Sequence, residues 1–183
     1  MWNILRISVV AVAVTLILSG CVPTAPVRSV VPKPTSTPIF ASDDEALAAA
    51  TKAYAAYTNA LDVAFSTWDT SKLEGVASGQ ALLVAKRSVA KYEKLGKHQK
   101  GLTRVDDVSL VDPHAVTSVP AAAGLQIYAC LDLTRVDVVD ASGKSVVPAE
   151  DARRFPIIAS LSVKPQSILR VDRDEIWNGQ SFC

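Results

Sequence analysis

The hydrophobic period of this chain changes near residue 102. Before that point, apolar residues recur every three or four positions, which is the spacing of a helix face. After it, apolar and polar residues alternate, which is typical of a strand with one buried face. Helices followed by antiparallel strands predict an α+β domain. We expect N-terminal helices packed on one face of a curved, four-stranded antiparallel sheet.

The helical half contains two clear segments. Ser42 and Glu45 form the pattern of a capping box, so a long helix is predicted over residues 43–67. Its expected buried face consists of Leu47, Ala50, Tyr54, Tyr57, Leu61, Ala64 or Phe65, and Trp68. A helical turn is expected within residues 71–76, and Ser78 is a candidate N-cap for a helix over residues 79–98.

The strand half contains four candidate strands. They are expected over residues 102–112, 125–139, 155–164 and 167–177. In the second, Leu125, Ile127 and Ala129 are predicted to point to one face of the sheet, with the intervening polar residues on the other. The segment 140–144 is predicted to be a turn in which Gly143 adopts positive φ.

The N-terminus has the features of an export signal. Arg6 precedes a largely apolar run over residues 7–18, which as a helix would be about 18 Å long. A bilayer core is about 30 Å thick, so this run is short for a membrane span but suits a signal peptide. We therefore expect residues 1–20 to be a signal peptide.

The sequence Leu18-Ser19-Gly20-Cys21 resembles the lipobox of bacterial lipoproteins. This resemblance implies cleavage before Cys21 and a diacylglyceryl group on its thiol; ordinary secretion with a nearby cysteine is the alternative. The expected location is the extracytoplasmic face of the bacterial cell membrane. Residues 21–40 are rich in proline and predict an extended tether, and residues 41–183 then form the folded domain.

The order of predicted elements resembles the cone-shaped superfamily of nuclear transport factor two and ketosteroid isomerase. The segments Cys130-Leu131-Asp132 and Val139 to Gly143, with a terminal Cys183, also resemble secreted lipoproteins of high-GC Gram-positive bacteria with this fold. The resemblance implies an extracytoplasmic domain, often without known activity.

Two cysteines remain if Cys21 carries lipid. An even pair in an exported domain predicts a disulfide between Cys130 and Cys183; two free thiols are the alternative. We expect no metal or other cofactor, because His98 and His114, both predicted in turns or loops, lack suitably spaced partners.

Charge argues against nucleic acid as a partner. Without Arg6, the mature chain has 18 basic and 18 acidic residues. The segment from Lys86 to Arg104, however, has seven basic residues and only one acidic residue, Glu93. These candidate contacts for an anionic lipid or wall surface are Lys86, Arg87, Lys91, Lys94, Lys97, Lys100 and Arg104; a solvated helix face is the alternative.

A cone fold encloses space between helices and sheet, where polar side chains could meet a ligand. The candidate pocket residues are Tyr54, Tyr57, Tyr128 and Asp132. Asp132 would act as a base only if burial raised its pKa. Tyrosines at helical spacing are otherwise core residues with the hydroxyl at the rim.

The expected function is a non-catalytic binding or assembly module of the cell envelope. Lipid on Cys21 would hold it to the membrane, and its partner would be an envelope protein or an anionic surface. The alternative is a small-ligand carrier or isomerase-like enzyme. An open apolar cavity containing Asp132 and a tyrosine hydroxyl would favour this alternative, whereas a filled interior would favour the first function.

Overall fold

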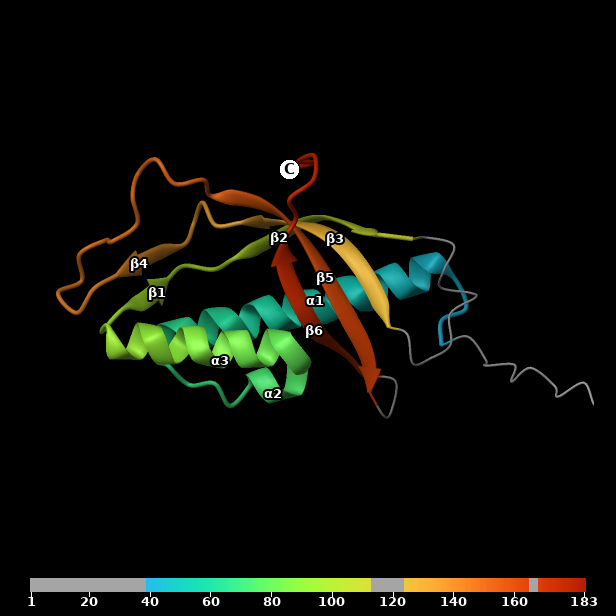
Figure 1. Cartoon of the computed structure of the whole chain (residues 1–183), viewed down its shortest axis with the longest axis horizontal. Helices are drawn as coiled ribbons and strands as arrows, with labels where there is room; N and C mark the ends of the chain where they lie inside the picture. The colour runs from blue at the N-terminus through green and yellow to red at the C-terminus, as the bar shows by residue number, and fades with distance from the viewer. Residues whose placement is uncertain (1–38, 113–123, 165–167) are drawn as a thin grey trace, which may run out of the picture. The chain divides into compact units, whose positions relative to one another are not determined.

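The computed structural model describes residues 39–112, 124–164 and 168–183, and these form an α+β domain (Figure 1). The helices are α1 (Asp43–Thr67), α2 (Leu73–Val76) and α3 (Gly79–Lys94). The strands are β1 (His98–Lys100), β2 (Arg104–Leu110), β3 (Leu125–Asp132), β4 (Asp137–Val139), β5 (Arg154–Lys164) and β6 (Ile168–Ile176). The predicted signal peptide, Cys21, His114 and the tether up to residue 38 lie outside the described residues.

Helix α1 has the predicted bounds and a slightly different cap. The Ser42 hydroxyl accepts a hydrogen bond from the Glu45 amide at 3.2 Å, but the Glu45 carboxylate accepts from the amide of Ala41, one residue earlier than the standard box. The helix ends at Thr67 and is followed by the C-cap residue Trp68, whose φ is 63°. No helix in the described ranges is both long and apolar enough to span a bilayer.

Helix α3 is shorter than predicted. It ends at Lys94 because Gly96 adopts φ +62° and its amide returns to the Glu93 carbonyl at 3.0 Å. The chain then enters β1, so the expectation that His98 lies in a turn or loop is wrong. The His98 ring stacks on Trp68, and its Nδ1 is 3.0 Å from the Ser66 carbonyl oxygen.

The main sheet has the antiparallel strand order β2-β3-β5-β6. The predicted continuous strand over residues 125–139 is wrong, because a turn separates β3 from β4. The Asp132 carboxylate accepts the Thr134 amide at 2.8 Å, and the Val136 amide returns to the Leu133 carbonyl at 3.0 Å.

Strand β4 pairs with β1 beyond this turn and extends the β2–β3 hairpin past the end of the main sheet (Figure 1). Gly101 lies at the break in the hairpin with φ +83°. A Cβ atom there would be 1.8 Å from the Arg135 carbonyl oxygen, so only glycine fits.

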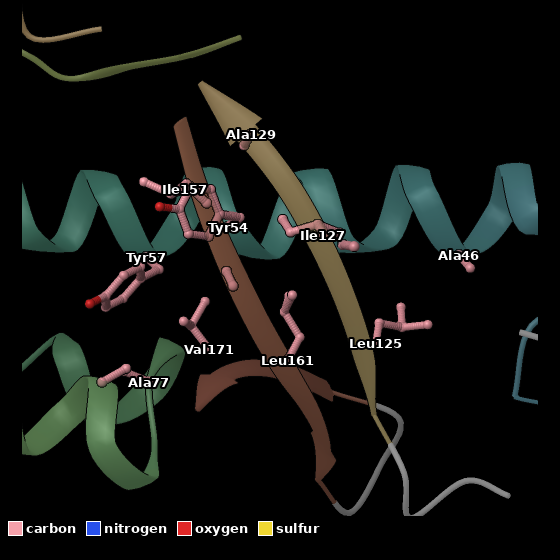
Figure 2. Packing of buried hydrophobic residues seen from close by; sticks show 13 residues of the cluster. Ala46, Tyr54, Tyr57, Ala77, Leu125, Ile127, Ala129, Ile157, Leu161 and Val171 are labelled. Carbon is pink, nitrogen blue, oxygen red and sulfur yellow. The ribbon is translucent and has the colours of Figure 1, made fainter. Parts of the chain in front are cut away.

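The core lies between α1 and one face of the main sheet. Figure 2 shows Tyr54 of α1 in one layer with Ile127 of β3 and with Ile157 and Leu161 of β5. All four side chains are fully or almost fully buried. Small residues of α1, such as Ala46 and Ala50, let the helix approach the strands closely. The predicted packing of helices on one sheet face is therefore observed.

The C-terminal tail covers part of the other sheet face. Cys130 of β3 forms the predicted disulfide with Cys183, with a Cα–Cα distance of 5.7 Å. Tyr128, two residues earlier on the same face, packs edge-on against Trp177 and Phe182. The disulfide therefore ties the chain terminus to the middle of the sheet.

We predict that replacing Cys183 with Ala lowers the free energy of unfolding by about 4 kcal/mol. The two cysteines are separated by 53 residues in sequence. Losing the cross-link increases the conformational entropy of the unfolded chain much more than that of the folded domain, so the unfolded state becomes more favourable. Urea denaturation with tryptophan fluorescence measures the change. Ser181→Ala in the same tail is the control, and equal stability of the Cys183→Ala variant would contradict the prediction.

Candidate functional site

Two tyrosines of α1 bring hydroxyl groups to the space between helices and sheet. Tyr54 is fully buried, and its hydroxyl donates a hydrogen bond to Asp174 Oδ1 of β6 at 3.0 Å. Tyr57 lies almost one helical turn later, 3% exposed, with its ring centroid 6.0 Å from that of Tyr54. Both hydroxyls belong to the helix-facing layer (Figure 2).

Asp174 faces the helices because β6 contains a bulge. Arg173 pairs with Ser160 but Val171 pairs with Leu161, so Asp172 is an extra residue between them. Val171 is buried against the helices, and strict alternation from it would turn Arg173 inward and Asp174 outward. The bulge reverses this order and places a carboxyl group in the core layer.

Burial changes the acidity of this group. Removal from water raises the pKa of Asp174 to about 6; the Tyr54 hydrogen bond opposes this effect, and the nearby charge of Glu175 adds to it. Burial likewise raises the pKa of both tyrosines, and proximity to Asp174 adds to that rise. Near pH 6, Asp174 can therefore change protonation state while both tyrosines remain hydroxyl donors.

Asp174 lines two adjoining hollows on the helix-facing side of the sheet. The larger has a volume of about 250 Å³ and is lined mainly by apolar and aromatic side chains of α1, α3, β3 and β4. The smaller has a volume of about 140 Å³ and includes Tyr57. Leu61, Phe65 and Asp174 line both hollows. Two half-open hollows therefore meet at Asp174.

A second carboxylate, Asp62, lines the larger hollow but is committed to the fold. It is 4% exposed and accepts hydrogen bonds from Gln99 Nε2, the Thr103 amide and the Thr103 hydroxyl at 2.5, 2.9 and 2.7 Å. These bonds attach β1, through Gln99, and the connection between β1 and β2, through Thr103, to helix α1. Its oxygens are thus occupied by protein donors, which distinguishes Asp62 from Asp174.

The structure does not bring the four predicted pocket residues together. Tyr54 and Tyr57 face the interior, whereas Tyr128 and Asp132 lie on the opposite face of the sheet. Asp132 forms hydrogen bonds with Thr134 that lower its pKa, helped by Arg104 and Arg154. Its proposed role as a base of raised pKa is therefore wrong. The carboxyl group with that property is Asp174.

The predicted basic segment divides into several environments. Lys86 forms an ion pair with Glu74, and Arg104 forms one with Asp106 at 3.1 Å. Arg87, Lys91 and Lys94 are exposed on α3. Lys97 follows the helix and Lys100 ends β1. Within the described ranges, no group of three or more metal-ligating side chains is present.

Comparisons with known proteins identify the fold but no family. No family model matches the sequence, and no curated protein sequence is similar to it. The chain is similar in structure to the intermembrane space region of chloroplast protein ARC6, with a TM-score of 0.52 and 13% identity over 71% of this chain and 95% of that one. A structure from Catenulispora acidiphila aligns with a TM-score of 0.41 and 12% identity. The alignment covers 71% of this chain and 88% of that one.

We predict that Asp174→Asn changes how stability depends on pH. A folded-state pKa of about 6, above the ordinary aspartate value of 3.8, means that the folded chain binds more protons than the unfolded chain between these values. Asp174 therefore stabilises the fold at low pH, and this stabilisation is lost as pH rises through about 6. The wild type should lose up to about 3 kcal/mol relative to Asp174→Asn between pH 3.5 and pH 7, as roughly two pKa units imply.

Denaturation of both proteins across this pH range measures the difference. Carboxyl groups of lowered pKa, such as Asp132, lose stabilisation as pH falls, but they contribute equally to both proteins and cancel. Asp151→Asn, at an exposed position, is the matched control. A constant difference between wild type and Asp174→Asn would contradict the assignment.

Proposed function

We propose that this chain is a membrane-anchored extracytoplasmic binding module whose site is the pair of hollows at Asp174. The observation that carries this proposal is a carboxyl group of raised pKa in the wall of an apolar cavity. Such a site suits a small ligand with an apolar body and one group that hydrogen-bonds to Asp174. The two half-open hollows at Asp174 favour a ligand-binding function over the protein-assembly function expected from the sequence.

The proposal includes a location outside the cytoplasm, with a lipid anchor, and membership of the cone-shaped superfamily. The lipobox-like sequence at Cys21 supports lipid anchoring, and a disulfide supports an oxidising compartment outside the cytoplasm. Helices that precede a four-stranded antiparallel meander support membership of the cone-shaped superfamily. The ARC6 region supports the fold alone.

The polar side chains near the hollows are hydrogen-bonded within the protein, which favours ligand binding over catalysis. An isomerase-type reaction needs a base and a separate donor directed at the substrate. The Tyr54 hydroxyl donates to Asp174 itself, and Tyr54 lines neither hollow. Asp62 accepts three bonds from the protein. We therefore propose a carrier or sensor rather than an enzyme.

An envelope-protein partner is the second candidate function. A groove of about 360 Å³ lies between α1, α2 and the start of β6. It is lined by small and aliphatic side chains, including Ala49, Ala53 and Ile168, which is 43% exposed. An apolar groove of this kind suits a segment of another protein.

Indole tests the ligand site, because it combines an apolar ring with one N–H donor. We predict that it shifts the NMR signals of residues around the larger hollow, such as Tyr92 and Leu131. Leu61→Trp, which adds bulk at the wall shared by both hollows, should abolish these shifts. Leu83→Trp on the exposed surface of α3 is the matched control. Shifts that persist in Leu61→Trp would contradict the site.

A further inference from the structure

Helix α3 has an outward ridge that no interaction within the described domain uses. Leu83, Arg87, Lys91 and Leu95 follow one another at four-residue spacing, from the helix to the residue that caps it, and therefore lie along one side. Leu83 and Leu95 are 65% and 51% exposed. The opposite side of the helix, with Ala85 and Val89, is buried against α1.

The charge of this ridge is positive. Lys94 lies three residues after Lys91 and joins Arg87 and Lys91 on the exposed surface. Among the described residues, no carboxylate forms an ion pair with any of the three. Glu93 follows Lys91 by two residues, so it does not share their side of the helix. Lys86, by contrast, is paired with Glu74.

We infer that the α3 ridge docks on an anionic lipid surface. Basic side chains attract such a surface, and leucines at both ends of the basic centre can enter the boundary between headgroups and acyl chains. An acidic protein with an apolar patch would contact the same side chains, but the anchor proposed at Cys21 keeps this domain beside a membrane. The combination therefore favours lipid.

The lipid surface in this inference is the membrane that holds the proposed lipid anchor on Cys21, so this part of the inference rests on the proposed function. Nineteen residues, 22–40, separate Cys21 from Ala41 at the start of the predicted domain. At most about 3.5 Å per residue, they allow a reach of about 65 Å, so the domain can lie against the membrane that holds the anchor. The ridge would then orient the domain on that membrane.

Vesicle binding by the mature chain with Cys21→Ala tests the ridge without the anchor. The vesicles contain phosphatidylglycerol and phosphatidylcholine, or phosphatidylcholine alone, and cosedimentation at low salt measures the partition coefficient. We expect binding to the anionic vesicles only. Replacing Arg87, Lys91 and Lys94 with Gln should weaken it about 100-fold, at roughly 1 kcal/mol for each basic residue.

The control removes the same charge elsewhere. Lys52, Lys72 and Lys144, all exposed, are replaced with Gln, and binding should fall much less. Leu83→Gln should weaken binding severalfold at unchanged charge, and thermal unfolding checks that each variant is folded. No binding at low salt, or equal loss in the control, would overturn the inference. Intact mass of the natural protein tests the lipid on Cys21 separately, so failure of the anchor is distinguishable from failure of the ridge.

Discussion

The hydrogen bond between Tyr54 and Asp174 connects the two halves of this domain. It joins a fully buried hydroxyl of α1 to a carboxyl group of β6, 120 residues later in the chain. A carboxyl group in this layer costs free energy unless it is neutral or hydrogen-bonded. Near pH 6, Asp174 is protonated in part of the molecules, and it also accepts the hydrogen bond from Tyr54. The same placement puts Asp174 in the wall of two hollows. Packing of the core and chemistry of the candidate site therefore depend on one contact.

The two faces of the main sheet have different roles in this account. The helix-facing side holds the core, the hollows and Asp174. The other side holds the disulfide, the aromatic cluster of Tyr128 with the C-terminal tail, and the ion pairs of Arg154 with Asp106 and Asp107. This second side stabilises the sheet from outside and leaves the interior free for the candidate ligand. The basic ridge of α3 lies on the outside of the helical layer.

Hydrophobic period predicted most of the fold, because each long element buries one face. The bounds of α1 and the four strands of the main sheet follow from that period, and the disulfide follows from cysteine number in an exported chain. Two errors have a common cause. The turn at Asp132 and the bulge at Asp172 both depend on local backbone hydrogen bonding, which alternation of side chains does not reveal.

The bulge explains why the candidate site was only half predictable. Helical spacing identifies a buried face reliably, so it predicts Tyr54 and Tyr57. Strict alternation from Val171 does not predict Asp174, because it turns that residue away from the helices. Asp132 is a wrong candidate, because its position among the polar residues of β3 places it on the outer face. Nor did any sequence signal indicate that Asp62 accepts three hydrogen bonds from distant residues.

Asp174 is a half-buried carboxyl group in the wall of two largely apolar hollows. An NMR titration of the side-chain carboxyl carbons, with Asp174 assigned by comparison with a substituted variant, measures its pKa directly. We expect a midpoint of about 6, well above the ordinary value of 3.8 for an aspartate. A midpoint for Asp174 at or below that ordinary value of 3.8 would show a solvated or ion-paired carboxylate and would contradict this assignment.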